Sequence, residues 1–153
     1  MACDISAAPR DPGYAFDVGS ILLVEADSET CDRWSTALGA EGHAVLAATV
    51  MRDALPLIRE GGIDVVVIDA YDTCIGVIEL ARHINALPDS PPIVLVSGSP
   101  SAPEVSARIG AAHFLPKPCE PEEVVAVVGR LLGRLRPVRV VEDEPTGPTR
   151  QYG

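Results

Sequence analysis

The sequence has few aromatic residues and few basic ones. Aromatic residues make up only 4% of the 153 positions, so a core must be built from Val, Leu, Ile and Ala. Lysine and arginine number 12 against 22 aspartates and glutamates, which gives a formal net charge of -10. A nucleic-acid surface needs a stripe of positive charge, so this balance argues against nucleic acid as a partner. It favours protein partners or a cation.

The chain also lacks long apolar stretches and paired spacings of metal-binding residues. No run reaches the ~20 apolar residues of a membrane span, and no apolar core follows a basic N-terminus, so neither a span nor a signal peptide is predicted. The four cysteines are Cys3, Cys31, Cys74 and Cys119. Their scatter favours reduced thiols in a cytoplasmic protein over a zinc site or a disulfide framework. The histidines, which are predicted at the surface, are His43, His83 and His113.

One stretch, residues 63–69, has the composition of a fully buried strand. It reads Ile-Asp-Val-Val-Val-Ile-Asp, a β-branched apolar run that ends at Asp69. Such a run predicts a central strand of a parallel sheet with helices on both faces. Open α/β sheets hold their sites at the carboxyl ends of strands, so the chemistry is predicted to centre on Asp69.

Strands and helices are predicted to alternate along the chain. The predicted strands cover residues 20–25, 43–48, 63–69, 93–96 and 113–115. The predicted helices cover residues 27–41, 49–60, 76–86, 103–109 and 121–135. This pattern predicts a single doubly wound, flavodoxin-like α/β domain, with five parallel strands in the order 2-1-3-4-5 and five helices. The domain is predicted at 19–136, between flexible arms at 1–18 and 137–153.

Apolar stripes predict the buried faces of two helices. The stripe of the helix at 27–41, which Asp27 or Ser28 is predicted to cap, consists of Thr30, Trp34, Ala37 and Leu38. The stripe of the last helix consists of Val124, Val125, Val128, Leu131, Leu132 and Leu135. Gly129 and Gly133 lie one turn apart on that helix. They predict close packing on the sheet, and the alternative is a self-association face that would give a homodimer.

The second helix carries an internal proline. Thr49 is its predicted cap, and Gly61-Gly62 is predicted to end it. Because proline removes a hydrogen bond from a helix interior, Pro56 predicts a kink or a late start.

Polar side chains stand at the carboxyl ends of the predicted strands. Glu25, Asp69 and Ser97 end three of them, and Lys117 follows the fifth. Adjacent strands lie about 4.8 Å apart, and the order 2-1-3-4-5 makes the first and third strands neighbours. Glu25 and Asp69 are therefore predicted to lie side by side. Two carboxylates that close repel, so either one holds a proton or a cation such as Mg2+ lies between them.

These segments together resemble a bacterial response-regulator receiver domain of the chemotaxis type. The resemblance covers about residues 20–135. It is carried by Ile-Leu-Leu-Val-Glu at 21–25, the strand that ends at Asp69, Ile-Val-Leu-Val-Ser-Gly at 93–98, and Gly-Ala-Ala-His-Phe-Leu-Pro-Lys-Pro at 110–118. The last piece is the most specific, because its glycine, aromatic, lysine and proline resemble the family's order.

The resemblance implies a magnesium site around a phosphoacceptor. Asp69 would accept the phosphoryl group from a histidine kinase or a phosphotransfer protein. Glu25 would help to hold Mg2+ through water, together with Asp69 and the backbone carbonyl of Tyr71. The family usually has a second acid after the first strand, where this chain has Ala26, so Mg2+ is expected to bind weakly. Asp27 is displaced by one residue and is expected to point elsewhere.

The resemblance also implies a switch. Lys117 would pair with the phosphoryl group, Ser97 would donate a hydrogen bond to it, and Phe114 would change rotamer with Ser97. Phosphoryl transfer needs this kind of positioning and charge neutralisation. The alternatives are a surface lysine at 117, a turn cap at 97 and an ordinary core position at 114.

Three functions compete. The first is a stand-alone cytoplasmic receiver that signals to an unidentified protein. It is not expected to be an enzyme, except that it would phosphorylate itself from a phosphodonor and remove its own phosphoryl group. By resemblance, its output surface is the face of the fourth helix, fifth strand and fifth helix. The alternative is a degenerate receiver that binds proteins without phosphorylation, for which Ala26 and the unusual loop at 70–76 are the evidence. A flavin or nucleotide enzyme is disfavoured, because residues 25–30 hold three acids and no glycine.

Overall fold

The computed structural model describes residues 18–70 and 75–135, in which five strands alternate with five helices. The strands are β1 (Ser20–Val24), β2 (Ala44–Ala48), β3 (Val65–Ala70), β4 (Ile93–Ser97) and β5 (His113–Pro116). The helices are α1 (Ser28–Ala40), α2 (Met51–Arg59), α3 (Ile75–Asn85), α4 (Ala102–Ile109) and α5 (Pro121–Leu135). The predicted arms, Val18 apart, lie outside the described residues, and so do Cys3, Cys74 and Tyr71.

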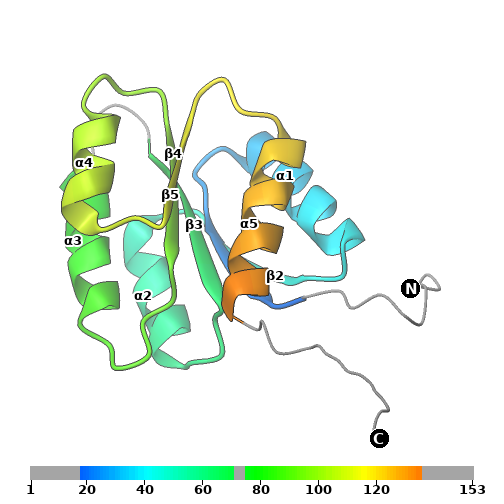
Figure 1. Cartoon of the computed structure of the whole chain (residues 1–153), viewed down its shortest axis with the longest axis horizontal. Helices are drawn as coiled ribbons and strands as arrows, with labels where there is room; N and C mark the ends of the chain where they lie inside the picture. Colours follow the sequence, from blue (N-terminus) through cyan, green and yellow to red (C-terminus); the bar gives the residue numbers. More distant parts are fainter. Residues whose placement is uncertain (1–17, 71–74, 136–153) are drawn as a thin grey trace, which may run out of the picture.

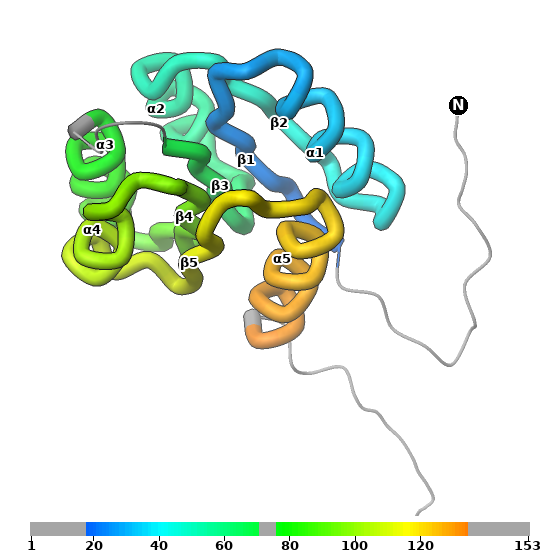
Figure 2. Tube along the Cα trace, turned by 90° about the horizontal axis from the view of Figure 1, so that it is seen from above, coloured from blue at the N-terminus to red at the C-terminus, as the bar shows by residue number. Residues whose placement is uncertain are grey.

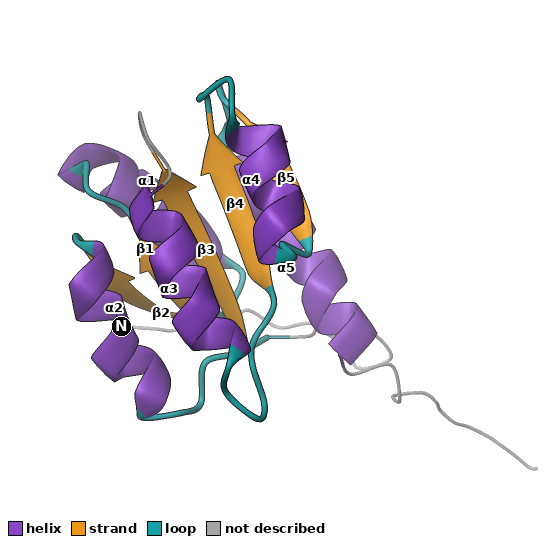
Figure 3. Cartoon of the chain, turned by 90° about the vertical axis from the view of Figure 1, so that its left-hand side faces the viewer, coloured by secondary structure: helices purple, strands orange, loops and turns teal. Residues whose placement is uncertain are grey.

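All five strands run parallel, in the order β2-β1-β3-β4-β5 (Figure 3). This confirms the predicted doubly wound fold. Parallel neighbours need a crossover connection, which explains why a helix separates each strand from the next. The order reverses between β1 and β3, where Val24 pairs with Ile68. The residues that follow this pair, Glu25 and Asp69, therefore stand level at the carboxyl edge.

Helices cover both faces of the sheet. Figures 1 and 2 show α2, α3 and α4 on one face and α1 and α5 on the other. Alternate residues of β3 enter the two cores: Val66 and Ile68 pack toward α2–α4, and Val65 and Val67 pack toward α1 and α5. All four are fully buried, as the apolar run predicts. Each such side chain stabilises the fold by about 1.5–3 kcal/mol relative to exposure.

The first helix follows its predicted stripe only in part. Its buried residues are Cys31, Trp34 and Leu38. Thr30 and Ala37 are only half-buried, so the predicted stripe is wrong at those two positions. The reason at Thr30 is local, because its hydroxyl donates to the carboxylate of the capping residue Asp27 at 2.6 Å. A side chain engaged at the cap cannot also turn into the core.

The last helix is rotated slightly from its predicted orientation. Val127 is buried, whereas Val125 is only half-buried and lies at the border of the core. Gly129 is exposed, and a Cβ added to it would meet no atom within 4 Å. The prediction that Gly129 packs closely on the sheet is therefore wrong. The self-association face stays a prediction.

The second helix starts later than its predicted cap. Val50 is the N-cap and makes no side-chain capping bond, so the prediction of Thr49 is wrong. The helix continues through Pro56 to Arg59. After it, both glycines at 61 and 62 have a φ of 86°, a conformation that side chains strain to adopt.

The histidine before β2 is buried, against the prediction. His43 is 8% exposed, and its Nδ1 accepts a hydrogen bond from the backbone N–H of Gly19 at 3.2 Å. The imidazole thus joins the start of β1 to the start of β2. Among the described residues, moreover, none of the helices has the length and apolar character that a bilayer crossing demands.

Candidate functional site

The two acids at the carboxyl edge are both buried. Asp69 is 3% exposed and Glu25 is fully buried. Two residues earlier in each strand, Val67 and Leu23 belong to the core shared with α1 and α5. Because side chains alternate along a strand, both acids project toward that same face.

Lysine 117 reaches this pair of acids from the far side of β4. Its Nζ lies 2.6 Å from Oδ1 of Asp69, and its side chain is 28% exposed. Its backbone N–H donates to the carbonyl of Ser97 at 3.2 Å, which joins the turn after β5 to the end of β4. The Lys117–Pro118 peptide is cis. The predicted convergence of Lys117 on Asp69 is thus observed.

The electrostatics of Asp69 favour a bound proton or a bound cation. The pKa of Asp69 is raised to about 8, first by burial and then by the neighbouring Glu25 carboxyl group, while Lys117 lowers it. A single ammonium therefore does not compensate for two buried carboxyl groups. The predicted neighbourhood of the first and third strands gives the same two alternatives.

In the loop after β1, a backbone hydrogen bond orients Glu25. The next acid, Asp27, bonds to the start of α1 and not to the acid pair. Oε2 of Glu25 accepts a hydrogen bond from the backbone N–H of Asp27 at 3.0 Å. The Asp27 carboxylate itself caps α1, accepting from the N–H of Thr30 at 2.8 Å. These bonds to Thr30 lower the pKa of Asp27. Asp27 is therefore occupied as a helix cap, and its backbone contribution to Glu25 is one that sequence reasoning missed.

The donor set fits a weakly held hard cation. The buried carboxyl group of Asp69 lies against that of Glu25, so the two groups can share either a hydrogen bond or a cation. Glu25 offers a second carboxylate nearby. Ala26 is exposed and supplies no ligand, and across residues 18–70 and 75–135 no group of three or more His, Cys, Asp or Glu side chains could hold a metal. Mg2+ tolerates few protein ligands because it keeps several waters.

Ser97 lies at the same edge of the sheet as the two acids, whereas Phe114 lies on the opposite face of the sheet. Ser97 is 1% exposed, ends β4, and pairs in register with Ala70, one residue past Asp69. Its Oγ accepts a hydrogen bond from the N–H of Ser99 at 3.1 Å, so it also caps the following turn. Phe114 is half-buried and packs on the core shared with α2–α4, the face of the sheet away from Asp69.

A thiol also borders the site. The pKa of the Cys119 thiol is raised to about 11 by burial and by neighbouring carboxylates, with Glu123 first and Asp69 next. Cys119 therefore stays protonated at neutral pH and is a poor nucleophile. Of the two cysteines that the structure describes, Cys31 is buried and Cys119 is half-buried, and both are free thiols.

The fold and this edge together define a class of protein. A parallel sheet in the order β2-β1-β3-β4-β5, with a buried acid pair and a lysine at its carboxyl edge, is the arrangement of a receiver-type α/β signalling domain. The sequence pattern of the response regulator receiver domain matches residues 21–129. The chain belongs to this family.

Named relatives agree with this assignment. Response regulator MprA of Mycolicibacterium vanbaalenii is 32% identical over 119 residues, which are 76% of this chain and 52% of that protein. Response regulator MprA of Mycobacterium leprae is 29% identical over the same length, with the same coverage of each chain. The chain thus spans about half the length of the curated relatives it matches.

Solved structures show the same fold. A putative response regulator from Chloroflexus aurantiacus has a TM-score of 0.68 and 27% identity, covering 76% of this chain and 98% of that one. A CheY-like receiver domain protein from Methanospirillum hungatei has a TM-score of 0.69 and 22% identity, covering 76% and 95%.

Proposed function

We propose that the domain accepts a phosphoryl group on Asp69 and signals through protein contacts. The observation that supports this most strongly is the Lys117 ammonium 2.6 Å from a buried Asp69 carboxyl group. The donor would be a histidine kinase or a phosphotransfer protein in the cytoplasm, and the receiving protein is unidentified. The only chemistry proposed is the domain's own phosphorylation and its reversal by water.

In the proposed transfer, a carboxylate oxygen of Asp69 attacks phosphorus as the bond from phosphorus to the donor's histidine nitrogen breaks. Asp69 must be ionised to attack, and its raised pKa opposes that. Lys117 stabilises the carboxylate and then the phosphoryl oxygens. Bound Mg2+, held by Asp69 and by Glu25 through water, would supply the remaining positive charge that phosphoryl transfer requires.

The proposed switch begins at Ser97. Its hydroxyl would turn to donate to a phosphoryl oxygen and would then no longer accept from the N–H of Ser99. Ser99 lies in the loop that leads to α4, so the change would reach that helix. Phe114 packs on the same core as Val105 and Ile109 of α4, so a shift of α4 would change the packing around Phe114.

The second candidate is a receiver that binds its partner without phosphorylation. Its evidence is Ala26, which removes an acid from the pocket, and the scarcity of metal ligands around Asp69 within the described ranges. In that case Asp69 would hold its proton beside Glu25, with Lys117 as the one compensating charge, and the pocket would be purely structural.

Phosphorylation with a small donor separates the two candidates. The protein is incubated with acetyl phosphate and Mg2+, and its mass is measured before and after treatment with base. The expected result is a base-labile gain of one phosphoryl group that Asp69→Asn abolishes and that Asp89→Asn, at an exposed loop position, does not. Absence of the gain even at high Mg2+ would favour the binding module.

A further inference from the structure

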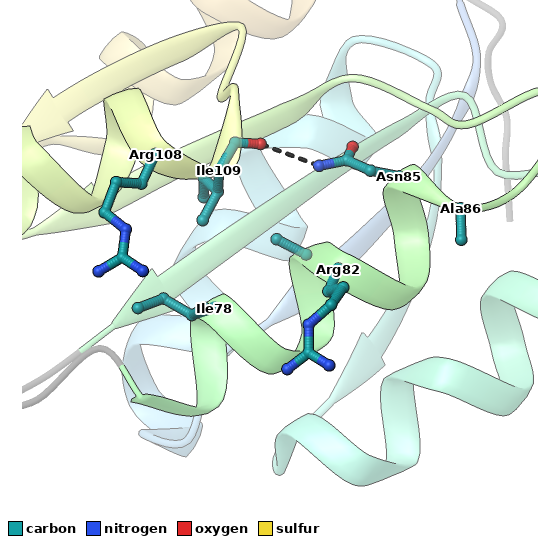
Figure 4. A pocket seen from close by; sticks show the side chains of 7 residues that line it. Ile78, Arg82, Asn85, Ala86, Arg108 and Ile109 are labelled. Carbon is teal, nitrogen blue, oxygen red and sulfur yellow. Dashed lines mark hydrogen bonds between the residues drawn. The ribbon is translucent and has the colours of Figure 1, made fainter.

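The two edges of the sheet are protected to different degrees. β5, at one edge, is four residues long and ends at Pro116, and both properties discourage the addition of a further strand. The helix that leads into β5 is also tied to α3, because the side-chain amide of Asn85 donates to the backbone carbonyl of Ile109 at 2.9 Å (Figure 4). β2, at the other edge, reads Ala-Val-Leu-Ala-Ala and contains neither a proline nor a charge. The β2 edge is therefore the one that needs a cover.

The backbone of β2 points part of its hydrogen-bonding groups away from the sheet. The N–H of Ala44 donates to the carbonyl of Gly19 at 3.0 Å, so Ala44 faces β1. Backbone groups of successive residues in a strand point to alternate sides, so the N–H and C=O groups of Val45 and Ala47 point away from β1. Among the described residues no strand lies beyond β2 to bond with them. They offer a ladder to one more strand.

Apolar side chains are exposed at this same edge. Leu46, in the middle of β2, is 44% exposed, and Val50, just after the strand, is 43% exposed. Val45 packs on the core shared with α1 and α5, so Leu46 projects to the α2 face of the sheet, where it is left uncovered. A strand added along β2 would bury Leu46 if it carried a large apolar side chain opposite this residue.

The chain enters β1 directly beside the start of β2. Nδ1 of His43 accepts a hydrogen bond from the N–H of Gly19 at 3.2 Å, and Oδ2 of Asp64 accepts one from the N–H of Ser20 at 2.8 Å. A Cβ added to Gly19 would lie 2.8 Å from Oδ2 of Asp64, so a side chain does not fit there without displacing its neighbours. The segment that precedes Gly19 is thus anchored next to the uncovered edge.

This preceding segment has the composition of a strand. Residues 12–16 read Pro-Gly-Tyr-Ala-Phe and lie outside the described residues, and Tyr14 and Phe16 are two of the six aromatic residues in the chain. Aromatic residues are depleted in segments that stay disordered and enriched in strands. We propose that this segment forms an antiparallel strand along the outer edge of β2, with Tyr14 opposite Leu46. An antiparallel edge strand is common on the otherwise parallel sheets of doubly wound folds.

This register uses the free backbone groups of β2. Ala15 would stand opposite Val45 and Gly13 opposite Ala47, and in such antiparallel pairs the two residues exchange both of their hydrogen bonds. Pro12, which has no N–H, falls just beyond the bonded pairs and would end the strand. The register therefore fits the proline as well as the bonding pattern.

The same register places the aromatic rings over the exposed leucine. Tyr14 and Phe16 are two residues apart, so both rings would lie on the α2 face of the sheet with Leu46. The Tyr14 ring would cover Leu46 while its hydroxyl group reaches water, an arrangement that suits the amphipathic tyrosine side chain.

The chain is long enough for this pairing. The added strand would lie two strand spacings, about 10 Å, from β1. Four Cα–Cα steps separate Phe16 from Ser20 and reach up to about 13 Å when extended. Residues 17–19 can therefore cross beneath the start of β2. The short connection also holds the segment at an effective concentration on the order of millimolar, which favours it over a second copy of the chain.

Amide hydrogen exchange in the full chain, followed residue by residue by NMR, tests the proposal. The N–H groups of Val45 and Ala47 are expected to exchange at least about tenfold more slowly in the wild type than in Ala15→Pro, which removes a donor from the proposed ladder. Ala8→Pro, outside the proposed strand, is the matched control and should keep the slow exchange. The N–H of Ala44, which bonds to β1, should stay protected in all three proteins and shows that β2 is folded.

A side-chain readout accompanies the exchange rates. Nuclear Overhauser contacts between the Tyr14 ring and the Leu46 methyl groups are expected in the wild type and should be lost in Ala15→Pro. Fast exchange of Val45 and Ala47 in the wild type would show that the edge is bare and would overturn the proposal. Slow exchange that survives Ala15→Pro would exclude this segment, and slowing that grows with protein concentration would make a second copy the occupant. None of these outcomes depends on phosphorylation.

Discussion

The ammonium nitrogen of Lys117 and the carboxylate of Asp69 meet at 2.6 Å although β4 lies between the strands that carry them. The contact is possible because Lys117 follows β5 and its side chain spans the end of β4. Glu25 completes the group from the opposite side.

Stability is expected to fall as pH rises, because the proton on Asp69 is bound more tightly in the folded state. The pKa of Asp69 is raised to about 8 mainly by burial, against an ordinary value of about 4. Between these values the folded state holds a proton that the unfolded state has lost. The free energy of unfolding should therefore decrease by up to about 1.4 kcal/mol per pH unit from this group. Urea unfolding at several pH values measures it.

The matched variant isolates the contribution of Asp69. Asp69→Asn cannot ionise, so the difference in stability between wild type and variant should shift steadily in the variant's favour from pH 4 to pH 8. Added Mg2+ should reduce that difference. A constant difference across this range would show that Asp69 titrates normally.

Restoring the absent acid is expected to strengthen metal binding. Ala26→Asp would add a carboxylate at the carboxyl end of β1, beside Glu25. The expected result is Mg2+ affinity higher by about tenfold, which corresponds to about 1.4 kcal/mol. Isothermal titration calorimetry measures it, with Ala126→Asp on the exposed side of α5 as the control for added charge. Equal effects of the two variants would contradict the placement of position 26.

The hydroxyl of Ser97 is expected to stabilise the turn before α4. Ser97→Ala leaves the N–H of Ser99 without its acceptor and should cost about 1 kcal/mol of unfolding free energy. Ser97→Thr keeps the oxygen and should cost less. Ser90→Ala, at an exposed position in the loop before β4, is the control. If Ser97→Ala were neutral in denaturant unfolding, the bond to Ser99 would have no energetic role.

Substituting alanine for either of two glycines is expected to change the stability of the domain, in opposite directions at the two positions. Gly129 lies inside α5 with open space around its Cα, so Gly129→Ala should stabilise the domain by about 0.5–1 kcal/mol. Gly110 has a φ of 69°, so Gly110→Ala should destabilise it by about 1 kcal/mol. Thermal unfolding compares the two. Destabilisation by Gly129→Ala would indicate that a partner covers this part of α5.

The architecture could be predicted because local patterns were strong. Residues 63–69 are apolar without interruption, and only a strand with helices on both faces buries such a run. Because strands that alternate with helices run parallel, Glu25, Asp69 and Lys117 must share one edge of the sheet. Their convergence is thus a consequence of topology, not of any local motif.

The errors arose where contacts between distant segments decide the outcome. The burial of His43 depends on the N–H of Gly19, which is remote in sequence. Val125 and Val127 both fit an apolar stripe, and only the packing of α5 against α1 and the sheet decides between them. Asp27 could be read as a cap, but its backbone bond to Glu25 has no sequence signal.

One spectrum tests the central claim directly. Lys117 is the only lysine in the chain, so selective 15N-lysine labelling gives a single side-chain resonance. We expect this resonance to shift when acetyl phosphate and Mg2+ are added to the wild type, and to stay unchanged in Asp69→Asn. If the Lys117 resonance shifts in neither protein when the phosphodonor is added, the proposal that Asp69 accepts a phosphoryl group beside this lysine is contradicted.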